Sequence, residues 1–254
     1  MFSNLIERLP MLLLSLPVIF FSLSVHECCH GYAALKLGDS TARNFGRLTL
    51  NPLKHIDPIG LICMVLFHFG WANPVPINTR NFKNPRRDMA LSALAGPVSN
   101  VLLALVFGGL LRLALLGVTT HYEDDLVGIV GSLMSGGAAS VSSGFAIVAL
   151  LVYMLYLGVV INFSYAVFNL IPVPPLDGSR IFYVVLPPKW YFAVMKYERY
   201  IMFGMLALLW IGILDLPLSL AVGGLEKLTF SLFGMDELST AALQLIQIFV
   251  GTSL

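Results

Sequence analysis

Two histidines and a glutamate lie close together in an apolar stretch near the start of the sequence, in His26-Glu27-Cys28-Cys29-His30. Because an α-helix turns by about 100° per residue, His26 and His30 project roughly 40° apart and share one helix face. Two imidazoles at this spacing can bind one Zn²⁺ ion, and Glu27 lies beside them, where it can act on a water molecule. The spacing therefore predicts a metal site suited to hydrolysis.

The apolar setting of these three side chains supports a role inside a helix bundle. An ionised carboxylate facing lipid at mid-membrane costs about 2.5 kcal/mol or more, so the side chains must face the bundle interior. We expect them to bind a ligand there. The alternative is a cluster of hydrogen bonds between helices without any metal.

A catalytic zinc ion usually takes three protein ligands and leaves one position open to water. The best candidate for the third ligand is Asp177, in Asn169-Leu-Ile-Pro-Val-Pro-Pro-Leu-Asp-Gly178, where closely spaced prolines end an apolar stretch. Broken helices that present a polar group at membrane depth recur at functional sites. The alternative is that Asp177 caps a cytosolic helix that begins near Gly178.

Together these two motifs resemble those of the site-2 protease family of intramembrane metalloproteases. HECCH is similar to the family's HExxH, and NLIPVPPLDG resembles its Asn-x-x-Pro-x-Pro-x-x-Asp-Gly signature. Ala95-Gly-Pro-Val-Ser-Asn100 also resembles the family, and Gly70-Trp-Ala-Asn-Pro-Val-Pro-Ile-Asn78 looks like its small bacterial-type branch, which has no PDZ domain. The resemblance covers most of residues 20–180.

The resemblance implies that one catalytic Zn²⁺ is held by His26, His30 and Asp177. It further implies that Glu27 is the catalytic base and that Asn169 helps to hold the substrate. The implied function is a zinc-dependent endopeptidase that hydrolyses peptide bonds within or next to transmembrane segments of other membrane proteins. Its partners would then be a transmembrane protein or peptide substrate and the lipid bilayer.

Three asparagines are candidates for stabilising the oxyanion that develops during hydrolysis, namely Asn100, Asn162 and Asn169. For each of them, a hydrogen bond between helices is an equally good interpretation. Residues 70–78 hold too much proline for a helix interior, and they are predicted to form a short strand or hairpin. Because a substrate helix must unwind before its peptide bonds become accessible, we expect Val75 and Ile77 to pair with the extended substrate.

Composition places the chain in the membrane. Of its 254 residues, 57% are hydrophobic and only 11% are charged, against about 25% charged residues in soluble domains, and its mean hydropathy is +0.85. A net charge of +1 without a long basic run excludes nucleic-acid binding. We predict an all-α polytopic membrane protein with a single domain over 1–254, whose catalytic core covers about 10–180 and whose C-terminal helices cover about 197–254.

The hydrophobic pattern predicts a bundle of about 4–6 transmembrane helices. Residues 58–71 are too few to span, so they are predicted to form a re-entrant segment. The segments that flank it, 36–57 and 72–88, are basic and therefore cytosolic by the positive-inside rule. The apolar stretches cover about 10–37, 58–71, 89–118, 145–171 and 200–222, followed by a weaker amphipathic stretch at about 237–251.

These orientations place the metal site toward the cytosolic side of the membrane, and the bacterial-type resemblance implies a prokaryotic inner membrane. The main alternative function is a metal-binding membrane transporter that uses the same buried side chains. Against it, Glu27 supplies a base beside the metal, and no parallel pair of broken helices suggests an inverted repeat. Self-association into a homo-oligomer stays open.

Overall fold

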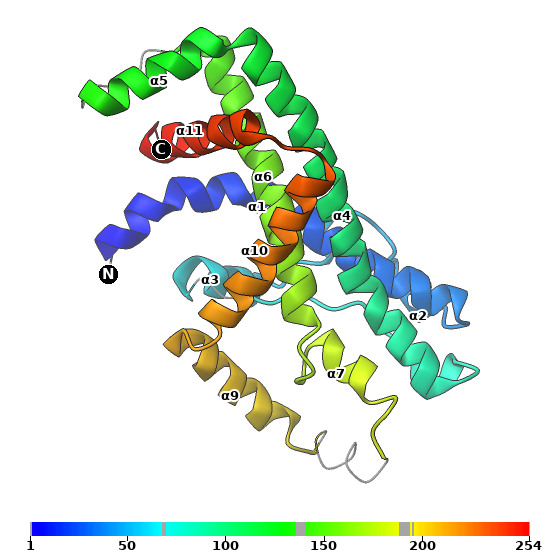
Figure 1. Ribbon diagram of the computed structural model, residues 1–254. Coiled ribbons are helices and arrows are strands. Elements are labelled where there is room, and N and C mark those ends of the chain that lie inside the picture. Colours follow the sequence, from blue (N-terminus) through cyan, green and yellow to red (C-terminus); the bar gives the residue numbers. More distant parts are fainter. Residues whose placement is uncertain (1, 68–69, 136–140, 188–193, 195, 254) are drawn as a thin grey trace. The chain divides into compact units, whose positions relative to one another are not determined.

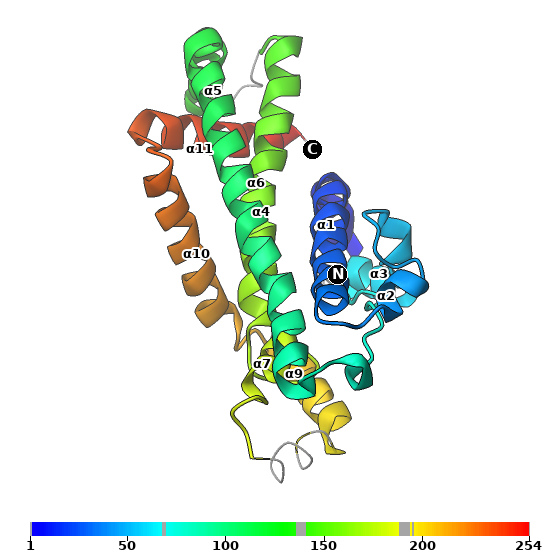
Figure 2. The same ribbon diagram turned by 90° about the vertical axis from the view of Figure 1, so that its right-hand side faces the viewer.

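The computed structural model of the chain describes residues 2–67, 70–135, 141–187, 194 and 196–253. Helices dominate these residues, and no β-strand is found among them (Figures 1 and 2). The helices are α1 (Phe2–Lys36), α2 (Thr41–Asn44), α3 (Pro58–Phe67), α4 (Pro85–His121), α5 (Glu123–Ser135), α6 (Ser143–Asn169), α7 (Asp177–Phe182), α9 (Glu198–Ile211), α10 (Asp215–Leu232) and α11 (Glu237–Ser253), with 3₁₀ turns η1 (Pro52–Lys54) and η2 (Thr79–Asn81).

Three helices are long and apolar enough to cross a membrane: the Leu12–Lys36 part of α1, α4 and α6. Helices α9 and α10 meet the same criterion only as a pair, and they are bent by 79° at their junction. The described part of the chain thus offers three spans, or four if the bent pair counts as one. The all-helical prediction is confirmed, and the lower end of the predicted 4–6 spans is reached only with the bent pair.

The bend divides the apolar stretch 200–222, which the hydrophobic pattern treats as continuous. Gly212 has a φ of +80°, in the left-handed region that glycine adopts without a steric penalty. Its N–H donates to the Leu209 carbonyl, and the Ile213 N–H donates to the Leu208 carbonyl, which closes the last turn of α9. Asp215 then begins α10.

The chain divides into two compact units. The first unit comprises residues 1–19, 103–161 and 225–254, and the second comprises residues 20–102 and 162–224. Every candidate site residue belongs to the second unit. The prediction of one domain over 1–254 stays a prediction.

Aromatic packing holds the first unit together. The fully buried Phe145 ring lies edge-on to Tyr122 and Phe249, with ring centroids 5.7 and 5.8 Å away. The charge of Arg112 within α4 is also partnered, because its guanidinium lies 3.9 Å from the Asp236 carboxylate and donates to the Ser239 hydroxyl at 2.5 Å.

In the second unit, α3 is 10 residues long, too short to span. The residues on either side of it meet: Ile56 and Ala72 form an isolated antiparallel bridge, and the Asn73 N–H donates to the His55 carbonyl at 2.8 Å. Both flanks of the 58–71 segment therefore end at the same place, as a re-entrant segment requires. Residues 68–69 lie outside the described part.

The strand or hairpin predicted for residues 70–78 is not supported. Pro74 and Pro76 carry no N–H, so they cannot donate to a ladder of backbone hydrogen bonds. The N–H groups of Val75 and Asn78 donate to carboxylate side chains instead of to another strand. Beyond the single bridge at Ala72 and the Asn73 bond to His55, no ladder of backbone hydrogen bonds forms among the described residues of this segment.

Candidate metal centre

Three side chains from distant parts of the sequence converge on one small space in the second unit. His26 and His30 lie one turn apart on α1, and their Nε2 atoms are 2.9 Å apart. The Oδ2 atom of Asp177, at the start of α7, lies 3.2 Å from the His26 Nε2 and 3.1 Å from the His30 Nε2. Both histidines are buried, with exposures of 5% and 7%.

The end of α6 delivers Asp177 to this space. After Asn169 the prolines prevent the helix from continuing, and a turn leads directly into α7 (Figure 1). A Cβ atom at Gly178 would collide with the backbone carbonyls of Leu170 and Ile171, so the first turn of α7 packs on the end of α6 through a glycine. Asp177 does begin a helix, but the N-cap residue is Leu176 and the Asp177 carboxylate faces the imidazoles.

The hydrogen bonds of the two imidazoles decide which nitrogens are free. His30 Nδ1 lies 2.8 Å from the Ser92 carbonyl oxygen, which can only accept, so Nδ1 carries the proton. His26 Nδ1 lies 2.5 Å from Asn100 Oδ1. The amide nitrogen of Asn100 donates to Asn162 Oδ1 at 2.8 Å, which fixes the Asn100 oxygen toward His26. Both Nδ1 atoms are therefore donors, and both neutral rings present an Nε2 lone pair.

Two nitrogen lone pairs and a carboxylate oxygen within about 3 Å of one another repel unless a cation lies between them. A proton can join only two of these atoms, whereas a metal ion accepts all three. Two histidines and one carboxylate form a ligand set used by catalytic zinc sites. The residues present therefore fit a metal ion.

A buried chain of polar side chains supports His26 from behind. Asn162 donates from Nδ2 to the Ser22 hydroxyl at 2.8 Å, so Ser22, Asn162 and Asn100 link α1, α6 and α4 to the imidazole. All three side chains are fully buried. Metal-binding histidines are usually oriented in this way through their second nitrogen. The substrate-binding role predicted for Asn100 and Asn162 stays a prediction. In the structure Asn100 orients His26 directly, and Asn162 does so through Asn100.

One stripe of α4 faces the two histidines. Ser92, Gly96 and Asn100 follow at intervals of four residues and so lie on the same helix face. A Cβ atom at Gly96 would overlap both imidazoles, so only a glycine leaves room for them. Sequence reasoning missed Ser92 and Gly96, although their four-residue spacing from Asn100 was a signal that could have found them.

We expect Asn100→Ala to weaken zinc binding by about 10–100-fold, because His26 loses the group that orients its ring. The measurement is a competition titration of purified protein against a chromophoric zinc chelator. Asn169→Ala is the matched control, since the Asn169 amide donates to the Tyr165 carbonyl of its own helix. Equal zinc affinities for the two variants would contradict the orienting role of Asn100.

Glu27 is held by the backbone of the proline-rich segment. We call residues 73–78 the strap. The Val75 N–H donates to Glu27 Oε2 at 2.8 Å, and both residues are buried, with exposures of 7% and 8%. The bond engages one carboxylate oxygen only, so it orients Glu27 and leaves the other oxygen for a water molecule.

Both ends of the strap are anchored. At its start, the Arg47 guanidinium donates to the carbonyl oxygens of Asn73 and Pro74, at 2.6 and 3.3 Å. At its end, the Asn78 N–H donates to Asp39 Oδ2 at 2.7 Å. Arg47 and Asp39 were missed by sequence reasoning, because a single polar residue beyond a helix end carries no distinguishing pattern.

Asp39 is a fully buried carboxylate that lies just beyond α1. Burial alone would raise the pKa of Asp39, but hydrogen bonds from Thr41, Asn81 and Asn78 hold it below its ordinary value. Because the pKa of the folded state is lowered, these bonds stabilise the fold above the unfolded-state pKa, and that stabilisation is lost as the pH falls through the folded-state pKa. The strap therefore stays anchored at neutral pH.

Two predicted substrate residues are not joined to the three metal-facing atoms by hydrogen bonds in the described part of the chain. Asn169 lies at the end of α6, and Ile77 lies partly buried in the strap. Their substrate roles stay predictions. The structure brings together His26, His30 and Asp177, with Glu27 held beside Val75.

A buried His-His-Asp cluster next to an oriented glutamate, on a helix long enough to cross a membrane, is typical of a membrane-embedded metal-dependent hydrolase. The chain belongs to peptidase family M50, the site-2 protease family, whose model matches residues 15–212. It is thus a peptidase and a multi-pass membrane protein.

Two curated relatives support this assignment. The chain is 39% identical over 183 residues to "Putative zinc metalloprotease YwhC" of Bacillus subtilis (strain 168), covering 72% of each chain. It is 30% identical over 161 residues to "Putative zinc metalloprotease Rip2" of Mycolicibacterium smegmatis (strain ATCC 700084 / mc(2)155), covering 62% of this chain and 51% of the relative. No solved structure matches the chain.

Proposed function

We propose that this chain is a zinc-dependent intramembrane endopeptidase that cuts peptide bonds within or next to transmembrane segments of other membrane proteins. The observation that carries the proposal is the convergence of two imidazole lone pairs and the Asp177 carboxylate on a span that also bears Glu27. The zinc named in both relatives agrees with this ligand set.

When bound, Zn²⁺ supplies Lewis-acid polarisation of the scissile carbonyl and lowers the pKa of the attacking water. Glu27 takes the proton from that water and passes it to the leaving amine. Val75 holds Glu27 in place during both steps, because its N–H keeps one carboxylate oxygen fixed. Asn100 and the Ser92 carbonyl keep both imidazoles turned with Nε2 toward the Asp177 carboxylate, so that these three groups would hold the ion.

The strap is suited to holding an unwound substrate. Asn73 and Val75 precede prolines, which favours extended backbone at both positions. In an extended segment the N–H groups of alternate residues point to the same edge. The Val75 N–H points toward Glu27, so the Ile77 N–H lies on the edge that faces Glu27. A substrate strand that pairs along this edge would lie next to the base.

Ile77→Pro should therefore impair substrate binding, because it removes the backbone N–H that would donate a hydrogen bond to a carbonyl oxygen of the extended substrate. We expect kcat/KM for a transmembrane substrate to fall about tenfold, in line with one lost hydrogen bond of about 1.4 kcal/mol. Zinc content should not change. Ile77→Val, which keeps the N–H and most of the side chain, is the control, and equal kcat/KM values for the two variants would rule out pairing at this edge.

We also propose that the chain resides in a prokaryotic inner membrane with its metal centre toward the cytosol. Support comes from the basic segments 36–57 and 72–88, which favour the cytosolic side. The meeting of Ile56 with Ala72 allows both segments to lie on that side.

The function is tested by reconstituting the purified chain in vesicles with a protein that has a single transmembrane segment. We expect cleavage within or next to that segment, loss of cleavage after chelation, and recovery with one zinc ion per chain. The transporter alternative predicts zinc uptake into the vesicles without cleavage. That result would overturn the proposed function.

A further inference from the structure

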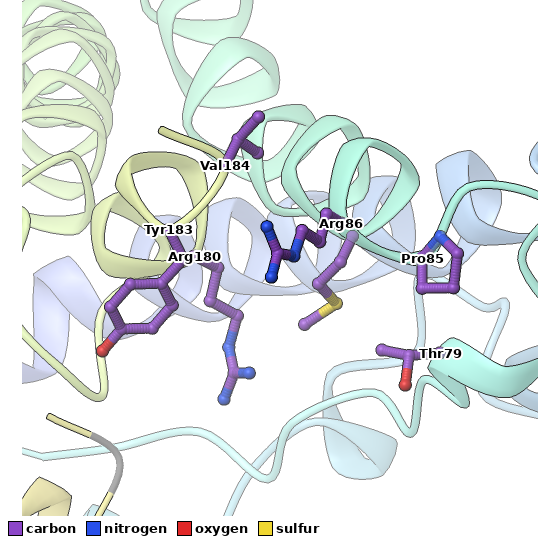
Figure 3. A pocket seen from close by; sticks show the side chains of 7 residues that line it. Thr79, Pro85, Arg86, Arg180, Tyr183 and Val184 are labelled. Carbon is purple, nitrogen blue, oxygen red and sulfur yellow. The ribbon is translucent and has the colours of Figure 1, made fainter. Parts of the chain in front are cut away.

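A hollow of about 170 Å³ lies at the junction of η2, α4 and α7, within the second unit. Arg86, from the first turn of α4, and Arg180, from α7, reach into it from two sides (Figure 3). Thr79 adds a hydroxyl, while Pro85, Met89 and Val184 form apolar walls. We call this site the arginine hollow.

Neither arginine of the hollow has a counter-charge among the described residues. Within the part of the chain that the structure describes, Arg86 and Arg180 make no ion pair and no side-chain hydrogen bond, and no carboxylate lines the hollow. The neighbouring Arg87 behaves differently, since its guanidinium pairs with the buried Asp88 at 2.8 Å. Arg86 is exposed and Arg180 is half-buried. The like charges of two side chains that line one hollow are balanced when an anion binds there.

The position of the hollow relates it to the membrane surface. Arg86 lies in the first turn of the span α4, and Arg180 follows shortly after the last residue of the span α6. Lipid headgroups lie at the ends of spanning helices, and the headgroups of anionic lipids attract clustered basic residues. The apolar walls suit the first carbons of the acyl chains of a lipid better than a fully hydrated ion.

We propose that the arginine hollow binds a phosphate group, supplied by the headgroup of an anionic phospholipid. Guanidinium groups recognise phosphate through paired N–H donors, and two of them from different helices can hold two sides of one phosphate. The Thr79 hydroxyl provides a further donor. The proposal does not depend on peptidase activity.

Binding there would also act on the metal centre. Arg180 lies three residues after Asp177 on the six-residue helix α7. A phosphate that joins Arg180 to Arg86 ties this short helix to α4, which also carries Ser92, Gly96 and Asn100. The lipid would thereby hold the third metal-facing side chain in place.

The test measures binding of dihexanoyl phosphatidylglycerol, a short-chain soluble lipid, to the purified full-length chain in a neutral detergent. Inorganic phosphate is titrated in parallel. The key variant is Arg86→Lys with Arg180→Lys, which keeps both charges but loses the paired donors. The control is Lys54→Gln with Lys83→Gln, which removes two charges outside the hollow.

We expect the arginine-to-lysine pair to weaken lipid binding at least tenfold, while the lysine-to-glutamine pair has a smaller effect. A diffuse attraction between basic residues and the anionic lipid predicts the reverse order. Each lost surface charge would then lower lipid affinity about fivefold, and replacing arginine with lysine would leave the affinity unchanged. That reverse order would overturn the site. Inorganic phosphate that binds as tightly as the lipid would overturn the headgroup as its source. Circular dichroism of each variant shows that it is folded.

Discussion

Glu27→Gln should abolish cleavage and leave the metal in place. General-base catalysis contributes about 10²–10⁴-fold to rate, and a glutamine amide cannot take a proton from water. Glutamine has the shape of glutamate, and its carbonyl oxygen can still accept the Val75 N–H. The strap, the two imidazoles and Asp177 should therefore stay where they are.

The measurement pairs the cleavage rate of a single-span substrate with the zinc content of the same preparation. We expect at least a hundredfold loss of rate with one zinc ion retained per chain. Glu237→Gln, at an exposed glutamate in α11, is the control and should cleave normally. If Glu27→Gln cleaves at the normal rate, Glu27 is not the base.

Gly96→Ala is expected to destroy the metal centre while stabilising α4, the helix that contains Gly96. Alanine is a better helix former than glycine by about 1 kcal/mol, so α4 itself should gain stability. The added methyl group, however, would occupy the space of both imidazoles. Neither ring can withdraw without losing its bond to Asn100 or to the Ser92 carbonyl.

Zinc affinity of Gly96→Ala should fall by more than the ~10–100-fold expected for loss of a single orienting group, and cleavage should fall with it. Gly117→Ala, on the same helix but with open space around the added Cβ, is the matched control. Competition titrations against a chelator and thermal unfolding of both variants separate metal loss from unfolding. A Gly96→Ala protein that binds zinc normally would contradict the close approach of α4 and α1.

The chemistry of the site was more predictable than its surroundings. His26 and His30 follow from helical periodicity alone, because four residues bring them to one face. Asp177 needed the proline-rich break before it, and its approach to the imidazoles is a tertiary contact that spacing does not encode. The bend at Gly212 was missed because glycine does not interrupt an apolar pattern.

The supporting residues were harder to predict for a physical reason. Helices α4 and α6 are apolar on nearly all sides, so hydrophobic periodicity does not show which face is turned inward. Asn100 and Asn162 were recognised as polar residues of interest, but the direction of their amides depends on which helices meet. The anchoring of the strap by Asp39 and Arg47 likewise depends on loop positions that the sequence does not reveal.

The placement of Asp177 at the start of α7 has a consequence for assembly. The two imidazoles belong to the first long helix, and the carboxylate belongs to a short helix that follows the third of the three spanning helices. An ion bound by all three would join the beginning of the catalytic region to its end. Metal loading is then also a step of maturation, in which a chain that has inserted α1, α4 and α6 becomes closed around its own reaction centre.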